Sequence, residues 1–143
     1  MLLTIDIGNT QTVLGLFQGD DLDHTWRIAT YDTRTADELA VLITSLLTQH
    51  DGGTTVTGIA LCSTVPVALH EMRQMCTRYY SDIPVVVVEP GVRTGVPILT
   101  DNPKEVGSDR IVNSLAAGTV YGGPAIVVDF GTATTFDAVS AKG

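Results

Sequence analysis

Two short stretches of the sequence place an aspartate at the end of an apolar strand, just before a glycine-containing turn. The first runs from Leu2 to Leu16 and carries Asp6 and Gly8. A strand buries a carboxylate only with a partner, and a hydrated Mg²⁺ is one such partner. Gly8 has no Cβ, so backbone N–H groups can come close to an anionic ligand. The stretch fits phosphate binding, and it also fits a plain hairpin turn in which Asp6 accepts local hydrogen bonds.

The same pattern recurs in residues 126–139. The corresponding pairs are Asp6 with Asp129, Gly8 with Gly131, Thr12 with Thr135 and Val13 with Phe136. Two such hairpins about 120 residues apart indicate an internal duplication. A phosphate-binding hairpin in each half predicts a nucleotide held in a cleft, with Asp6 and Asp129 facing each other. This plan resembles that of the actin, hexokinase and Hsp70 group of phosphotransferases and ATPases.

The composition narrows the classes of partner. The chain has 143 residues, 44% of them apolar, and a net charge of −8 from 8 basic and 16 acidic residues. This balance argues against nucleic acid or an anionic membrane as a main partner. No apolar run reaches membrane-spanning length and the N-terminus lacks a basic segment before an apolar one, so we expect a cytoplasmic protein. Cys62 and Cys76 form no CxxC pair, and we expect two reduced thiols in the core.

The order of apolar patterns predicts an α/β protein. Thr35 and Glu38 have the spacing of a capping box, and apolar residues then recur every three or four positions, which predicts an amphipathic helix. The run of four valines at 85–88 is typical of a fully buried strand. Together the patterns favour a ribonuclease-H-like or actin-like mixed sheet flanked by helices. The expected elements are a hairpin over 2–16, strands over 22–28, 56–62 and 85–88, and helices from 35 to before Gly52 and from Pro66 to Tyr79. The apolar stripe of the second helix is expected to consist of Leu69, Met72, Met75, Cys76 and Tyr79.

A further helix is expected before the second hairpin, and two starting points fit the sequence. It could begin at Pro103 with Asn102 as its cap, or near Ser108, because Gly107 interrupts the first option. Either start places Asp109 near a helix N-terminus, where a carboxylate also compensates the helix dipole without any further role.

The repeated pattern stops soon after its second hairpin begins. We therefore expect a first domain over 1–122 and, over 123–143, the first hairpin of a truncated second domain of the same type. An isolated hairpin is marginally stable in water. A protein that ended at Gly143 is therefore expected to be inactive, with its last hairpin mobile or paired with another molecule.

Three motifs, in this order and spacing, resemble those of the type III pantothenate kinase family. They are Asp-Ile-Gly-Asn-Thr at 6–10, Gly-Ser-Asp-Arg at 107–110 and Asp-Phe-Gly-Thr-Ala at 129–133, and the stretches at 89–95 and 102–103 extend the resemblance over the whole chain. The resemblance implies an enzyme that transfers the γ-phosphate of ATP to the hydroxyl of pantothenate, giving 4′-phosphopantothenate in the first step of coenzyme A synthesis. It also implies a homodimer, and a need for Mg²⁺ or another divalent ion and for K⁺ or NH₄⁺.

The resemblance also implies roles for matching residues. Asp109 would accept the proton of the pantothenate hydroxyl, Asp129 would bind the monovalent cation, and Asp6 would be oriented towards the divalent ion. The ATP-binding residues would be Asp6, Ile7, Gly8, Asn9, Thr10, Gln11, Thr12, Val13 and Thr132, and the pantothenate-binding residues Gly107, Ser108, Asp109 and Arg110. The family often has an aromatic residue that contacts the substrate where this chain has Thr100, so Thr100 departs from the pattern. Ser108 in place of the usual alanine is a smaller change.

Two other classes of function fit parts of the same pattern. An ATPase of the actin or Hsp70 kind would use both hairpins and would need no base at Asp109. A non-catalytic relative of the Bvg accessory factor type would share the fold without the reaction. Phosphorylation of pantothenate separates the kinase from both classes.

Overall fold

The computed structural model describes residues 1–142, and Gly143, the last residue of the predicted second hairpin domain, lies outside the described residues. The chain forms two compact units that divide between Val87 and Val88. The first unit contains β1 (Leu2–Ile7), β2 (Gln11–Gln18), β3 (Asp21–Ala29), α1 (Ala36–Asp51), β4 (Gly58–Ser63), α2 (Pro66–Tyr79) and β5 (Val85–Val88). The second contains the short 3₁₀ helix η1 (Pro103–Glu105), α3 (Ser108–Val120), β6 (Ala125–Phe130) and β7 (Thr134–Val139).

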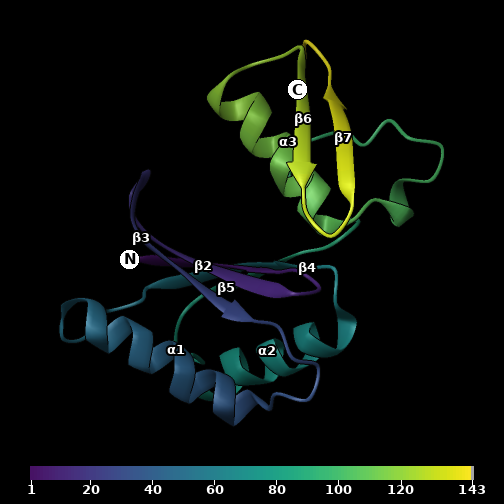
Figure 1. The fold of residues 1–143 in the computed structure, drawn as a ribbon. Helices are drawn as coiled ribbons and strands as arrows, with labels where there is room; N and C mark the ends of the chain where they lie inside the picture. The colour runs from purple at the N-terminus through teal and green to yellow at the C-terminus, as the bar shows by residue number, and fades with distance from the viewer. Residues whose placement is uncertain (143) are drawn as a thin grey trace. The chain divides into compact units, whose positions relative to one another are not determined.

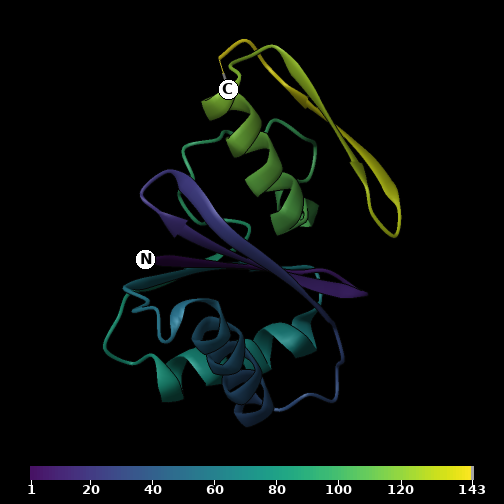
Figure 2. The ribbon, with the colours of Figure 1, turned by 60° about the vertical axis from the view of Figure 1, so that its left-hand side comes forward.

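The first unit is a five-stranded mixed sheet with strand order β3-β2-β1-β4-β5. β1 pairs antiparallel with β2 and parallel with β4. Helices α1 and α2 pack against each other on the same face of this sheet (Figure 1, Figure 2). The prediction of a mixed α/β protein with helices against its sheet is therefore confirmed.

Buried apolar residues alternate along β1 with less buried ones, and the buried residues lie on the face of the sheet that the helices cover. Leu3, Ile5 and Ile7 are each at most 1% exposed and belong to one apolar core, which also contains Ile43 of α1 and Met75 of α2. Successive side chains on a strand point to opposite faces, so the residues between them lie on the other face of the sheet. Asp6 is one of these, and its side chain is exposed.

The ends of α1 follow the predicted signals. The Thr35 hydroxyl accepts the N–H of Glu38, while the Glu38 carboxylate accepts the N–H of Thr35 at 2.8 Å, which completes the capping box. These hydrogen bonds to Thr35 lower the pKa of Glu38. The helix is followed by Gly52, which adopts a left-handed conformation with φ of 80°.

Two expectations about the first unit are wrong. Residues 85–88 do not form a fully buried strand: β5 is an edge strand, and Val86 is 52% exposed because it points to the face opposite Val85 and Val87, which pack against the core. Tyr79 does not belong to the apolar stripe of α2. It is 53% exposed, its hydroxyl donates to Asp37 Oδ1 at 2.8 Å, and Tyr80 packs against the core in its place.

The second unit settles where the third helix begins. Residues 103–105 form only a short 3₁₀ helix, and α3 starts at Ser108 with Gly107 at its N-cap, so the later of the two predicted starts is the right one. β6 and β7 pair antiparallel, and α3 packs against both strands. The predicted domain boundary at 122/123 is based on an internal duplication, and it stays a prediction. It differs from the boundary between the two compact units, which lies after Val87.

Both cysteines of the chain lie in the first unit and are buried. Cys62 and Cys76 form no disulfide within the described residues, and burial raises the pKa of the Cys76 thiol to about 11. Among the described residues, no helix has both the length and the apolar character needed to cross a membrane.

Candidate functional site

The turn between β1 and β2 brings backbone groups close together. The Gly8 N–H donates to the Gln11 carbonyl at 3.0 Å, and the Thr10 carbonyl accepts the N–H of Thr30 at 3.0 Å. A Cβ on Gly8 would lie 3.1 Å from the Gln11 carbonyl oxygen, which is closer than most real contacts allow. A side chain at position 8 would therefore push the turn open.

Asp6 stands at the end of β1 with an exposed side chain. The Cys62 thiol donates to Asp6 Oδ1 at 3.3 Å from the neighbouring strand β4, where Cys62 is the register partner of Asp6. A thiol is a weak donor, so it holds the carboxylate in place without neutralising its charge. The carboxylate is thus exposed at the end of β1, beside the turn.

The other predicted ATP-binding residues of this turn divide into two groups. Asn9, Thr10 and Gln11 are exposed, while Ile7 and Thr12 are buried and Val13 is half-buried. The Thr12 hydroxyl lies 2.9 Å from that of Thr30, a partner that no pattern in the sequence indicated. The hydroxyl of Thr12 is thus paired within the first unit, and its backbone lies inside β2, which pairs with β1 and β3.

In the second unit, one face of α3 carries polar side chains towards the β6–β7 hairpin. Arg110 and Asn113 are three residues apart and so lie on the same side of the helix. Arg110 reaches Asp137 on β7, and Asn113 Nδ2 donates to Asp129 Oδ2 on β6 at 3.4 Å. The helix thus holds one carboxylate on each strand of the hairpin.

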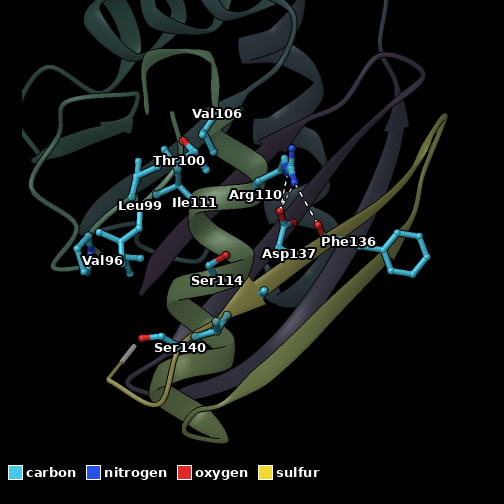
Figure 3. Close-up of a pocket in the computed structure, with 14 residues that line it drawn as sticks. Val96, Leu99, Thr100, Val106, Arg110, Ile111, Ser114, Phe136, Asp137 and Ser140 are labelled. Atoms are coloured by element: carbon cyan, nitrogen blue, oxygen red, sulfur yellow. Dashed lines mark hydrogen bonds and ion pairs between the residues drawn. The ribbon is translucent and has the colours of Figure 1, made fainter. Parts of the chain in front are cut away.

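The contact between Arg110 and Asp137 is the shortest hydrogen-bonded ion pair of this unit (Figure 3). Arg110 Nε donates to Asp137 Oδ1 at 2.6 Å, and its Nη2 donates to the Phe136 carbonyl at 3.2 Å. The hydrogen bond to Asp137 raises the pKa of the guanidinium above its ordinary value. The Asp137 side chain is 10% exposed, and its Oδ2 is buried without a hydrogen-bond partner among the described residues.

Asp109 lies in the first turn of α3 and is half-buried. Its Oδ1 accepts the backbone N–H of Arg110 at 2.9 Å. This position suits both interpretations of the sequence, a charge that compensates the helix dipole and a base beside a substrate.

A cavity of about 360 Å³ opens within the second unit beside Arg110 and Asp137 (Figure 3). Its volume falls within the range of about 300–1,000 Å³ that is usual for small-molecule sites. Arg110, which is predicted to bind substrate, and Thr100, which departs from the aromatic residue of the family, both line it, whereas Gly107, Ser108 and Asp109 do not. The other lining residues are Val96, Pro97, Ile98, Leu99, Val106, Ile111, Ser114, Phe136, Asp137, Ala138, Val139 and Ser140.

Sequence reasoning missed Asp137, although a signal was present. Asp137 is a carboxylate within the apolar run of β7, which is the feature that singled out Asp6 and Asp129. Its partner Arg110 is 27 residues away, and their pairing depends on how α3 packs against β7. The loop residues that form the opposite wall of the cavity gave no comparable signal.

The two hairpins share a pattern but not a register. Asp6 pairs with Val13, whereas Asp129 pairs with Thr135, because the second turn is one residue shorter. The Gly131 N–H donates to the Ala133 carbonyl at 3.1 Å, two residues on, whereas Gly8 reaches three residues on. The predicted correspondences of Thr12 with Thr135 and of Val13 with Phe136 are therefore displaced by one position in the register.

The predicted site residues fall into two sets. The residues from Asp6 to Val13 belong to the first unit, whereas Thr100, the stretch 107–110, Asp129 and the exposed Thr132 belong to the second. That Asp6 and Asp129 face each other across a cleft stays a prediction. Within the described part of the chain, no group of three His, Cys, Asp or Glu side chains could hold a metal ion, so each aspartate would contribute a single carboxylate.

Comparison with known proteins gives one consistent result. A sequence model of the family described as type III pantothenate kinase matches residues 2–143. Proteins named type III pantothenate kinase from Streptomyces coelicolor and Acidothermus cellulolyticus are each 65% identical to the chain, over 148 and 143 residues, and one from Thermobifida fusca is 63% identical over 146 residues. Each comparison covers 100% of this chain and 56% of the relative, so the chain spans about half the length of the curated relatives it matches. The chain belongs to the type III pantothenate kinase family, as its three motifs predicted.

Proposed function

We propose that a full-length protein carrying this chain transfers the γ-phosphate of ATP to the primary hydroxyl of pantothenate. The observation that carries the proposal is the cavity of about 360 Å³ lined by Arg110, since the neighbouring residue along α3 is Asp109. A cavity of this size with a polar wall suits a small polar substrate. Asp109 does not itself line the cavity, but it lies next to Arg110 on α3, so a carboxylate and a cation fall within one turn of that helix.

The turn after β1 is the proposed site for the phosphates of ATP. The turn is tight, because the backbone of Gly8 lies close to the Gln11 carbonyl, and such a turn can present backbone N–H groups to phosphate oxygens. The exposed Asp6 carboxylate fits a Mg²⁺ ion, because Mg²⁺ is usually held by one or two carboxylates together with phosphates and water. When bound, the ion would neutralise charge that develops on the transferred group.

Asp109 is the proposed proton acceptor. Phosphoryl transfer passes through a loose transition state in which positioning and charge neutralisation dominate. A carboxylate is too weak a base to deprotonate an alcohol in advance. Asp109 would therefore orient the hydroxyl and take its proton late, as the oxygen–phosphorus bond forms and the bond to the leaving ADP breaks.

Further chain would complete the site. The outer face of the β6–β7 hairpin exposes Ile126, Val128, Phe130 and Phe136, with exposed fractions between 41% and 83%. Apolar groups gathered on one face mark a surface that another element covers. This supports, without demonstrating, the second domain of a duplicated pair, and pantothenate binding at a homodimer interface remains part of the same proposal.

The proposal is tested with labelled pantothenate and ATP in a full-length protein. Formation of 4′-phosphopantothenate with one ADP per product is the expected result. ATP hydrolysis that is independent of pantothenate would instead favour the actin-like ATPase, and ATP binding without either reaction would favour a non-catalytic relative.

A dependence on K⁺ or NH₄⁺ is expected in the same assay. Asp129 is half-buried and accepts a hydrogen bond from Asn113, and a carboxylate oxygen is a ligand that suits a hard cation. Replacing K⁺ by Na⁺ should lower turnover by about tenfold or more, because a cation fixed here helps an acidic protein hold an anionic nucleotide. Asp129→Asn should remove this difference between the two salts. Full activity in a sodium-only buffer would contradict the assignment of Asp129.

A further inference from the structure

We propose that Asp137 determines substrate specificity through its pairing with Arg110. The side of the cavity that these two residues form, called here the Arg110 wall, would bind the neutral hydroxyl and amide part of pantothenate and not its carboxylate. The inference rests on the proposed function and deepens it. Its starting point is that the one guanidinium lining this cavity is already paired.

The charge around Arg110 argues against a carboxylate at this wall. Its Nε donates to Asp137 Oδ1 at 2.6 Å, and Asp109 lies next to it with its own Oδ1 on the Arg110 backbone N–H. One positive charge thus faces two carboxylates, and both of them raise the pKa of the guanidinium. Asp137 already compensates the guanidinium charge at the wall and Asp109 lies close by, so a ligand carboxylate would meet like charges there, and such contacts are costly.

The hydrogen-bonding groups that remain at the wall suit a neutral ligand. The hydrogen bonds of Arg110 to described residues use Nε and Nη2, which leaves the Nη1 hydrogens as donors. Asp137 Oδ2 is a buried acceptor that receives no hydrogen bond from the described residues. It is enclosed in this structure, on a residue that lines the cavity. Hydroxyl and amide groups both donate and accept, so they match such a wall.

The rest of the cavity is mostly apolar. Val96, Ile98 and Leu99 form one side, and Val106 and Ile111 contribute another. Burying an ion among such groups costs far more than burying a neutral chain whose polar atoms are paired. The methyl groups and the amide of pantothenate fit these surroundings, and its carboxylate would then point away from Arg110.

Asp137→Asn in a full-length protein tests the proposal. Asparagine keeps one oxygen for Arg110, but it replaces the second acceptor by a donor and leaves the guanidinium charge uncompensated. We expect the KM for pantothenate to rise about tenfold, the effect of a lost and mismatched hydrogen bond, with kcat and the Kd for ATP within about twofold of wild type. Glu105→Gln is the matched control, because Glu105 is an exposed carboxylate of the same unit, and it should leave all three values unchanged.

Three analogues of pantothenate identify the group that meets Asp137. One lacks the secondary hydroxyl, one is methylated on the amide nitrogen, and one carries a carbinol in place of the carboxylate. The tenfold penalty of Asp137→Asn should fall below about threefold with the first or the second analogue and persist with the third. A penalty that persists with both of the first two, or that falls with the third, would overturn the proposal.

Two further measurements keep the outcomes separate. A wild-type protein that does not phosphorylate pantothenate would contradict the proposed function, whereas an active wild type with an unchanged Asp137→Asn variant would contradict only this inference. Thermal unfolding and ATP binding show whether the variant folds. If it does not fold, the proposal is tested by the kcat/KM of the wild-type protein with the analogues. The wild-type protein should lose more than about tenfold in kcat/KM with one of the first two analogues, and a loss below about threefold with both would overturn the proposal.

Discussion

Asp109→Asn in a full-length protein is expected to lower kcat for pantothenate phosphorylation by about 10²–10³-fold, in the range found for loss of a general base. The Kd for ATP should stay within about twofold, because the proposed phosphate turn after β1 is untouched. Asparagine retains an oxygen for the Arg110 N–H, which Asp109 Oδ1 now accepts at 2.9 Å. The substitution therefore removes the proton acceptor with little change to the start of α3. Single-turnover kinetics, together with ATP titrations, would measure both quantities.

The competing interpretation of Asp109 makes the opposite prediction. If its charge only compensates the dipole of α3, Asp109→Asn should lower the free energy of unfolding by about 0.3–1 kcal/mol and leave kcat unchanged. Glu105→Gln serves as the control, because it removes an exposed carboxylate of the same unit. A variant with wild-type turnover and a reduced melting temperature would assign Asp109 to the helix terminus alone.

Most of the helices and strands could be predicted from local signals in the sequence. The capping box at Thr35 and Glu38 and the glycine after α1 fixed the ends of that helix, because both act through neighbouring backbone groups. The position of β5 in the sheet could not be predicted in this way. A run of valines is typical of a strand buried on both faces, and whether a strand lies at the edge depends on the order of strands, which is a property of the whole sheet.

The site was predicted less completely, for a similar reason. Motifs identified Asp6, Asp129 and the stretch 107–110, since each lies in a short recognisable pattern. The pair of Arg110 with Asp137 joins residues 27 positions apart, and it depends on how α3 packs against β7. The buried hydroxyl pair of Thr12 and Thr30 likewise joins β2 to the residue after β3. Such contacts follow from tertiary packing, and no local spacing encodes them.

Ile43→Ala is expected to destabilise the first unit by about 2–5 kcal/mol, the usual cost of removing a buried aliphatic side chain and leaving a cavity. Ile43 is 0% exposed and belongs to the same core as Leu3, Ile5 and Ile7 of β1. Domains of ordinary size are stable by only about 5–15 kcal/mol, so the loss is a large share of the total. Because β1 leads directly into the turn at Gly8, the same core that stabilises the unit also fixes the proposed phosphate site.

Urea denaturation of the 143-residue chain, followed by tryptophan fluorescence, measures this effect. Trp26 is the single tryptophan of the chain and packs against the core of the first unit, so the signal reports on that unit. Val41→Ala is the matched control: Val41 lies on the same helix but is 69% exposed, and its truncation should change the free energy of unfolding by no more than about 0.5 kcal/mol. The midpoint should shift at constant slope for Ile43→Ala, because the surface exposed on unfolding stays nearly the same. Equal effects of the two substitutions would show that the packing of α1 against β1 does not stabilise this unit.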